Sequence, residues 1–258
     1  MDLDHPGPIC LVSYACHPVV LGRNDQFSAD YPGRVMAELN AYGIHALFMN
    51  GPCGDVDPLS NAHRWGSGSE HTLDLYGHDV ARVVLQGLTR ATDLDPAPLR
   101  FASRPCQILG QLPSLDDLTL LKANARDRLR LAPEDAGARL DLGWAEEMLD
   151  RLDRGTLSER MTAEVQVFGL GAAAVVGLAG EVFTGVGLRI REAWPKAPLI
   201  LAATTNGLLG YIPTREDIET AGYASNLACK IYDMLVPKPG EGERFADQAA
   251  EVIRQCLT

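Results

Sequence analysis

Two short apolar runs near the start of the chain each end in a polar loop that carries ionisable side chains. The first covers residues 9–15 and ends in the sequence CHP, residues 16–18, whose proline cannot donate a hydrogen bond to a neighbouring strand. The second covers residues 44–50 and ends in the loop GPCGDVDP, residues 51–58. Unbroken apolar runs of this length predict β-strands, and we expect the first strand to be buried.

The segment between these runs, residues 29–41, has apolar residues at helical spacing, and Asp30 is its predicted N-cap. A strand, a helix and a second strand in this order are the usual source of parallel pairing. Ligands of open α/β sheets bind at the carboxyl ends of such strands. We therefore expect His17 and the acidic loop 51–58 to meet at one edge of a sheet.

The rest of the chain predicts an α/β fold: a mixed sheet with flanking helices and an inserted helical hairpin near 114–153, all within one domain of residues 1–258. Ser114 is the expected N-cap of the first hairpin helix, and Pro133 lies near the start of the second. Apolar runs predict further strands at 99–109, 164–168, 174–178 and 198–204, and helical spacing predicts helices at 71–90, from about 183 to 193, 214–221 with Thr214 as its cap, and 241–257.

Composition narrows the classes of partner. The net charge of −11 argues against a nucleic-acid partner, which would need a basic face. Six scattered cysteines without a CxxC pair indicate neither a disulfide framework nor a cysteine zinc site. The acidic start lacks the apolar core of a signal peptide, and the longest apolar run, 168–179, is too short to span a membrane. We expect a cytoplasmic protein with a small-molecule substrate.

Three places in the sequence could carry chemistry: His17 at a strand end, Glu181 between a buried strand and a helix, and the aspartates Asp55 and Asp57. Each also has a structural interpretation. The helix dipole stabilises a glutamate just before a helix, and aspartates are common in turns. Together, a histidine and carboxylates with an open position suit zinc. A water on such an ion becomes a nucleophile near neutral pH, and a nearby carboxylate can take its proton.

Four segments carry a family resemblance, and they span residues 17–223. They are CHPVVLG followed by SADYPG, then GDVDP, then GEVFTGVGLRIRE, then NGLLGYIPTREDIETAGY. In this order they resemble the neutral/alkaline non-lysosomal ceramidase family, whose members are zinc amidohydrolases that cleave ceramide to sphingosine and a fatty acid. The resemblance implies that this chain corresponds to the C-terminal part of the family's N-terminal catalytic domain. The family's upstream HTHSGP-like segment and its C-terminal β-sandwich have no counterpart in the sequence.

The resemblance also implies roles for individual residues. His17, Glu181 and Tyr211 match zinc ligands of the family, and Tyr223 matches a tyrosine that polarises the substrate carbonyl. Asp57 stands where ceramidases have a serine in this loop, so ceramide itself is not the expected substrate. We assign proton transfer, or orientation of His17, to Asp55 or Asp57.

The expected function is that of a ceramidase-like zinc hydrolase that cleaves an amide or related bond, in an N-acyl amide, by means of a metal-bound water. Two alternatives stay open. The absent HTHSGP-like segment, which supplies a further zinc histidine, favours a non-catalytic member that binds a small ligand or a partner without an intact metal site. A distinct enzyme could also use Asp57 and His17 without a metal.

Overall fold

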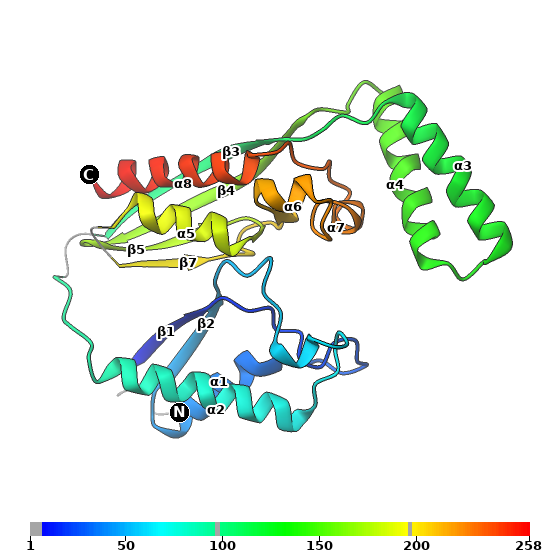
Figure 1. Cartoon of the computed structure of the whole chain (residues 1–258). Helices are drawn as coiled ribbons and strands as arrows, with labels where there is room; N and C mark the ends of the chain where they lie inside the picture. The colour runs from blue at the N-terminus through cyan, green and yellow to red at the C-terminus, as the bar shows by residue number, and fades with distance from the viewer. Residues whose placement is uncertain (1–6, 96–98, 196–197) are drawn as a thin grey trace.

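The computed structural model describes residues 7–95, 99–195 and 198–258, and it confirms the mixed α/β class (Figure 1). In chain order the elements are β1 (Ile9–Tyr14), α1 (Asp30–Ala41), β2 (His45–Asn50), a 3₁₀ turn (Leu59–Asn61), α2 (Glu70–Leu88), β3 (Leu99–Leu109), α3 (Leu115–Leu131), α4 (Ala136–Asp153), β4 (Arg160–Leu170), β5 (Ala173–Leu178), β6 (Glu181–Val182), α5 (Thr184–Ala193), β7 (Leu199–Ala202), β8 (Tyr211–Ile212), α6 (Arg215–Glu219), α7 (Leu227–Ile231) and α8 (Glu241–Leu257).

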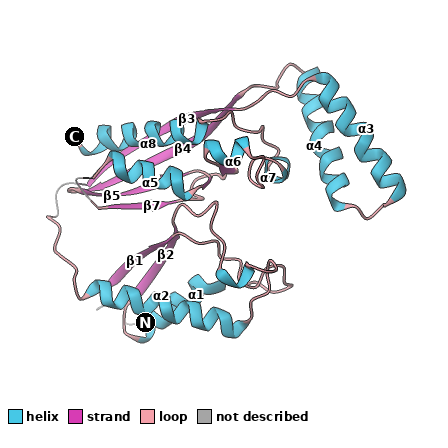
Figure 2. Ribbon diagram, viewed as in Figure 1, coloured by secondary structure: helices cyan, strands magenta, loops and turns pink. Residues whose placement is uncertain are grey.

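The larger sheet has four strands in the order β3-β4-β5-β7, of which only β5 and β7 run parallel. Side chains alternate along β4, so that Ala163, Val165 and Val167 are buried on one face. Helices α5 and α8 pack on that face and complete the largest apolar core (Figure 2). The opposite face carries Phe101 and Phe168, which lie on adjacent strands in register and are both exposed.

Strands β1 and β2 form a separate parallel pair, as the strand–helix–strand pattern predicts. One face of the pair packs on α1 and α2 around its own apolar core. The other face is open: Ile9 is 69% exposed, Leu11 37% and Leu47 55%. The expectation of a buried first strand is therefore wrong for most of this face, which meets β7 near the end of β1, where Ser13 donates a hydrogen bond to the carbonyl of Leu201.

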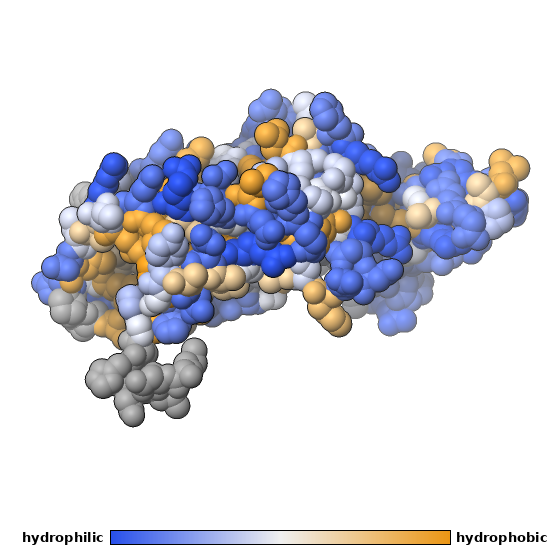
Figure 3. All heavy atoms as spheres, turned by 90° about the horizontal axis from the view of Figure 1, so that it is seen from below, coloured by the Kyte–Doolittle hydropathy of each residue, from blue (hydrophilic) through white to orange (hydrophobic). Residues whose placement is uncertain are grey.

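The predicted helical hairpin is confirmed as α3 and α4. It is the connection between the antiparallel strands β3 and β4, and it projects from the end of that pair (Figures 1 and 3). The Ser114 side chain accepts a hydrogen bond from the Asp117 amide and caps α3, as expected. Pro133 lies shortly before the start of α4, as expected, and the Asp135 side chain caps this helix. In the described residues no helix is long and apolar enough to cross a membrane.

Of two further expected helix caps, Asp30 is wrong and Thr214 is confirmed in position alone. Asp30 is the first residue of α1 rather than its N-cap, and its φ of 51° is in the left-handed region. Its carboxylate instead accepts hydrogen bonds from the amides of Val20 and Leu21, which lie in the loop that follows β1. Thr214 does stand at the N-cap of α6, but its side chain makes no capping hydrogen bond.

Candidate functional site

His17 is positioned by the loop that follows β1. Its Nδ1 lies 3.1 Å from the carbonyl oxygen of Val56, in the loop that follows β2, and the two loops also share a backbone hydrogen bond from the His17 amide to the same carbonyl. Because a carbonyl can only accept, the proton of the ring is fixed on Nδ1. The imidazole therefore turns its Nε2 toward the other sheet.

Glu181 and Tyr211 are neighbours because β6 and β8 pair in parallel with these two residues in register. Glu181 lies in the strand, three residues before α5 begins at Thr184, so it does not cap the helix as its position in the sequence suggested. Glu181 is 8% exposed and Tyr211 is 9% exposed. The short strand pair thus delivers one carboxylate and one phenol side by side.

The structure brings together the three residues that the family resemblance assigns to a metal. His17 Nε2 lies 2.7 Å from Glu181 Oε2, and the Tyr211 hydroxyl lies 3.5 Å from the same nitrogen. They come from three segments that are far apart in the sequence. The distances show convergence of the side chains, and the role of each as a ligand remains a prediction.

Two further tyrosines complete the group. Tyr232, which the sequence did not single out, donates a short hydrogen bond from its hydroxyl to Glu181 Oε1. Tyr223 packs edge to face on Tyr211, with ring centroids 5.8 Å apart, and is 56% exposed. Three tyrosine rings therefore surround the carboxylate of one glutamate.

The two aspartates of the loop 51–58 differ in their surroundings. Asp55 accepts hydrogen bonds from the amide and the hydroxyl of Thr184, at 2.6 and 2.7 Å, and so caps the first turn of α5 from a distant loop. Asp57 Oδ1 lies 3.8 Å from His17 Nδ1, and its other oxygen accepts from Asn61. Asp57 is thus the aspartate closer to the imidazole, and Asp55 is occupied by a structural contact.

A cavity of about 730 Å³ opens over this group. It is large enough for a drug-sized organic molecule, since ligand pockets span about 300–1,000 Å³. Its wall combines apolar rings with the ionisable side chains described above. It is lined by His17, Val19, Gly54, Asp55, Val56, Asp57, Trp65, Glu181, Tyr211, Tyr223 and Tyr232.

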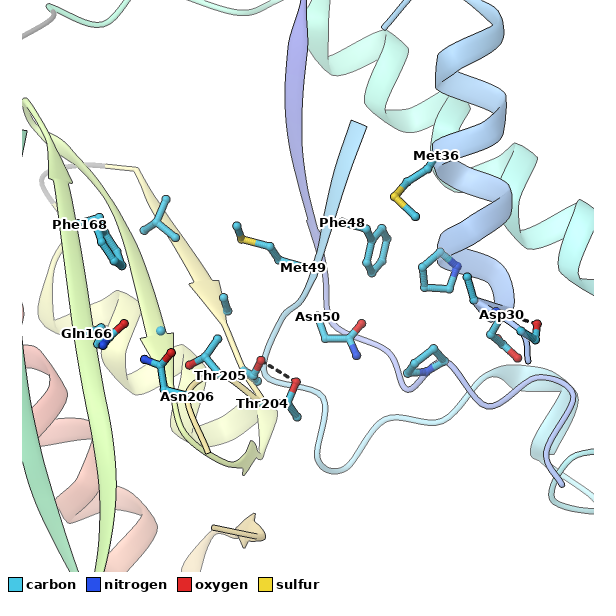
Figure 4. A pocket seen from close by; sticks show the side chains of 18 residues that line it. Asp30, Met36, Phe48, Met49, Asn50, Gln166, Phe168, Thr204, Thr205 and Asn206 are labelled. Atoms are coloured by element: carbon cyan, nitrogen blue, oxygen red, sulfur yellow. Dashed lines mark hydrogen bonds between the residues drawn. The ribbon is translucent and has the colours of Figure 1, made fainter. Parts of the chain in front are cut away.

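A second cavity, of about 700 Å³, lies between the open faces of the two sheets (Figure 4). Phe168 and Gln166 of β4 extend into it from one side and Met49 of β2 from the other. Its one ionisable residue is Asp30, whose oxygens are occupied by backbone amides. This cavity has no imidazole, thiol or free carboxylate in its described wall, so the first cavity is the candidate functional site.

Comparison with solved structures identifies the architecture. Over 95% of its length, the chain superimposes on neutral ceramidase from Pseudomonas aeruginosa with a TM-score of 0.62 at 13% sequence identity. It superimposes on a ceramidase complexed with C2 over 96% of its length, with a TM-score of 0.63 at 12% identity. The fold is that of the neutral ceramidases. The resemblance seen in the sequence is confirmed at the level of the fold.

The chain spans less than half of those structures, 43% of the first and 46% of the second. No family model matches the sequence, and no curated protein matches it. The similarity to the ceramidases is therefore a similarity of fold, and the chemistry of this chain must be argued from its own residues.

The distances of Glu181 and Tyr211 from His17 Nε2 are near the distance between two protein ligands of one zinc ion. Ligands at about 2.0–2.1 Å from a tetrahedral zinc stand about 3.3 Å apart, and the two separations of 2.7 and 3.5 Å fall on either side of this value. The Nδ1 contact with Val56 selects the tautomer in which Nε2 can bind a metal. Within residues 7–95, 99–195 and 198–258, no group of three or more His, Cys, Asp or Glu side chains is placed to bind a metal, so a site with three protein donors here would need Tyr211 as the third.

Opposite influences act on the pKa values of His17 and Glu181. Burial lowers the pKa of His17, but the hydrogen bond to Glu181 and the Val56 carbonyl outweigh it, and the pKa lies above 6.5. Burial raises the pKa of Glu181, but hydrogen bonds from His17, Tyr232 and Tyr211 outweigh it, and the pKa lies below 4.5. Between about pH 4.5 and pH 6.5 both side chains of the metal-free protein are therefore charged and form an ion pair.

This ion pair predicts how the stability of metal-free protein depends on pH. The contribution of His17 is complete below pH 6.5 and is lost as the pH rises through the higher pKa of the folded state. The contribution of Glu181 is complete above pH 4.5 and is lost as the pH falls through the lower pKa of the folded state. Urea unfolding in the presence of a chelator should show His17→Gln less stable than wild type by a larger margin at about pH 5.5 than at about pH 8.5. An equal margin at both pH values would contradict the ion pair.

Proposed function

We propose that the chain is a ceramidase-like zinc hydrolase that cleaves the amide bond of a small N-acyl amide. The observation that carries the proposal is the convergence of His17, Glu181 and Tyr211 on one wall of a cavity large enough for such a substrate. His17 and Glu181 would bind the ion through Nε2 and Oε2, and Tyr211 through its hydroxyl. Zinc, when bound, polarises a carbonyl group and activates water as a nucleophile near neutral pH.

The other residues of the site have roles that follow from their protonation and position. The pKa of Tyr223 is raised by burial and by the nearby carboxylates Glu181 and Asp57, so its hydroxyl keeps its proton and can donate to a carbonyl oxygen that becomes negative. Burial and the hydrogen bond to Glu181 raise the pKa of Tyr232, which thereby remains a donor. Asp57, partly exposed at the edge of the cavity and close to His17, would accept a proton.

The wall of the same cavity indicates the class of substrate. Trp65 and the rings of Tyr211 and Tyr223 offer apolar surface on which an acyl group can pack. Asp57 occupies the position of the family's serine and adds a negative charge to the cavity, which favours a neutral or cationic amine portion over an anionic one. Ceramide itself is not part of the proposal.

A second candidate, a non-catalytic member that binds a small ligand without metal, is favoured by one observation. Among the described residues the site offers only one imidazole and one buried carboxylate, and these already pair with each other at 2.7 Å. Such a site could bind an amide or an amine through the tyrosine hydroxyls and Glu181 alone.

Zinc content separates the two candidates. The zinc hydrolase should carry about one zinc per chain after purification and zinc dialysis, and His17→Ala should lose it, because three ligands would fall to two. Elemental mass spectrometry measures both proteins. The matched control is His78→Ala, whose exposed imidazole pairs with Glu38 far from the site in sequence. Wild-type protein without zinc would overturn the hydrolase proposal and leave the metal-free binder.

A further inference from the structure

The candidate site receives two of its three tyrosines from one irregular stretch, residues 223–234, which we call the tyrosine segment. Tyr223 opens it, the short helix α7 lies in its middle, and Tyr232 follows the helix directly. The residue after Tyr232, Asp233, has a φ of 49° in the left-handed region, which non-glycine residues seldom adopt. A segment of this kind holds its shape only when its surroundings fix it.

The surroundings that fix it belong to the helical hairpin. Trp144 of α4 donates from Nε1 to the carbonyl of Met234 at 3.2 Å, and Arg151 of α4 donates to the carbonyl of Asp233 at 3.2 Å. Both carbonyls lie within two residues of Tyr232. The hairpin therefore contacts the backbone immediately after the tyrosine that touches Glu181.

An ion pair ties the same segment to both helices of the hairpin. Lys230 of α7 lies 2.5 Å from Asp141 of α4, and both side chains are largely withdrawn from solvent, at 19% and 13% exposure. Arg128 of α3 binds the second oxygen of Asp141 at 2.9 Å. The side chains of Leu118, Trp144 and Met148 form an apolar cluster with Leu235, the residue just beyond the segment.

We propose that the hairpin α3–α4 is a positioning element of the candidate site: it holds the tyrosine segment so that Tyr232 donates to Glu181 and orients its carboxylate toward His17. Asp141 holds Lys230 on one side of Tyr232, and Arg151 and Trp144 hold the carbonyls of Asp233 and Met234 on the other. The hydroxyl of Tyr232 between them donates to Glu181 Oε1. None of the hairpin residues lines the cavity. The effect of the hairpin on a metal ligand rests on the proposed function, whereas the effect of the hairpin on the tyrosine segment does not.

The test uses two lysines of similar chemistry. Lys230→Met removes the tie from the segment and leaves Asp141 paired with Arg128. Lys122→Met is the matched control, because Lys122 pairs with Glu146 within the hairpin and Glu146 keeps Arg126 as a partner. Tyr232→Phe removes only the hydroxyl that reaches Glu181.

Hydrogen exchange followed by mass spectrometry measures how firmly the tyrosine segment and the strand at Glu181 are held, and it needs no metal. We expect Lys230→Met to speed amide exchange in residues 223–234 and in residues 178–184 around Glu181, and Tyr232→Phe to speed exchange in the second region. Lys122→Met should leave both regions as in wild type. Equal exchange in Lys230→Met and Lys122→Met would overturn the role of the hairpin, and unchanged exchange around Glu181 in Tyr232→Phe would overturn the role of Tyr232.

Zinc affinity, measured by competition with a chromogenic chelator, shows whether the loss of positioning changes the proposed metal site. Tyr232→Phe should weaken zinc by about tenfold to a hundredfold, the usual effect of removing a hydrogen bond that orients a ligand. Lys230→Met should weaken it by about threefold or more, and Lys122→Met should not change it. Wild-type protein that binds no zinc would overturn the proposed function, whereas the exchange result would still decide whether the hairpin positions the segment.

Discussion

Replacing Glu181 by glutamine is expected to lower the affinity for zinc by more than about a hundredfold, beyond the usual effect of removing an outer contact. Glu181 supplies the charged oxygen that lies 2.7 Å from His17 Nε2, and no other carboxylate in the described wall of the cavity is as buried. Glutamine has the same shape and can still accept the hydrogen bond from Tyr232. The fold should therefore survive, which circular dichroism and urea unfolding can verify.

The matched control for this variant is Glu192→Gln on α5, whose side chain is exposed and does not line the cavity. It should bind zinc like the wild type. Stoichiometric zinc in Glu181→Gln, at wild-type affinity, would remove Glu181 from the metal site and with it the central residue of the proposal.

The second large effect concerns Tyr223. Tyr223→Phe should lower kcat for hydrolysis of a fluorogenic N-acyl amide by about 10²–10³, the scale of losing one donor to a developing oxyanion. KM should change little, because the ring remains to pack on Tyr211 at 5.8 Å. The side chain is 56% exposed, so the stability of the protein should not change.

Tyr42→Phe is the control for that experiment, because Tyr42 is 62% exposed at the end of α1 and does not line the cavity. Its kcat should equal that of the wild type. A Tyr223→Phe protein with an unaltered kcat would show that this hydroxyl does not act on the carbonyl, whatever the role of the metal.

Most elements could be predicted because each has a regular pattern of apolar positions. The parallel pair β1–β2, the hairpin between β3 and β4, and the last helix α8 follow from such patterns. The two-residue strands β6 and β8 could not be found in this way, because their pairing depends on contacts between residues 30 positions apart. This pairing brings Glu181 beside Tyr211, so the geometry of the site could not be predicted from the spacing of apolar residues.

The candidate site was predicted in part. His17, Glu181, Tyr211, Tyr223 and Asp57 all line one cavity, and the family resemblance had singled out each of them. Tyr232 was missed because it follows a five-residue helix in a stretch without a motif. Asp55 was a candidate for proton transfer, but its contact with Thr184 depends on a helix start that lies 129 residues away in the chain. The role of Asp55 in proton transfer stays a prediction.

The site lies where two parts of the fold with separate apolar cores meet. His17 belongs to the part formed by β1, β2, α1 and α2, whereas Glu181 and Tyr211 belong to the part built on the larger sheet. A ligand that binds both sides contacts the two parts at once, and because it binds the folded protein rather than the unfolded chain, it stabilises the folded state. At a free ligand concentration of a hundred times Kd, binding raises the free energy of unfolding by about 2.7 kcal/mol. Ligands of this protein should thus be recognisable by a rise in its melting temperature, with no assay of a reaction needed.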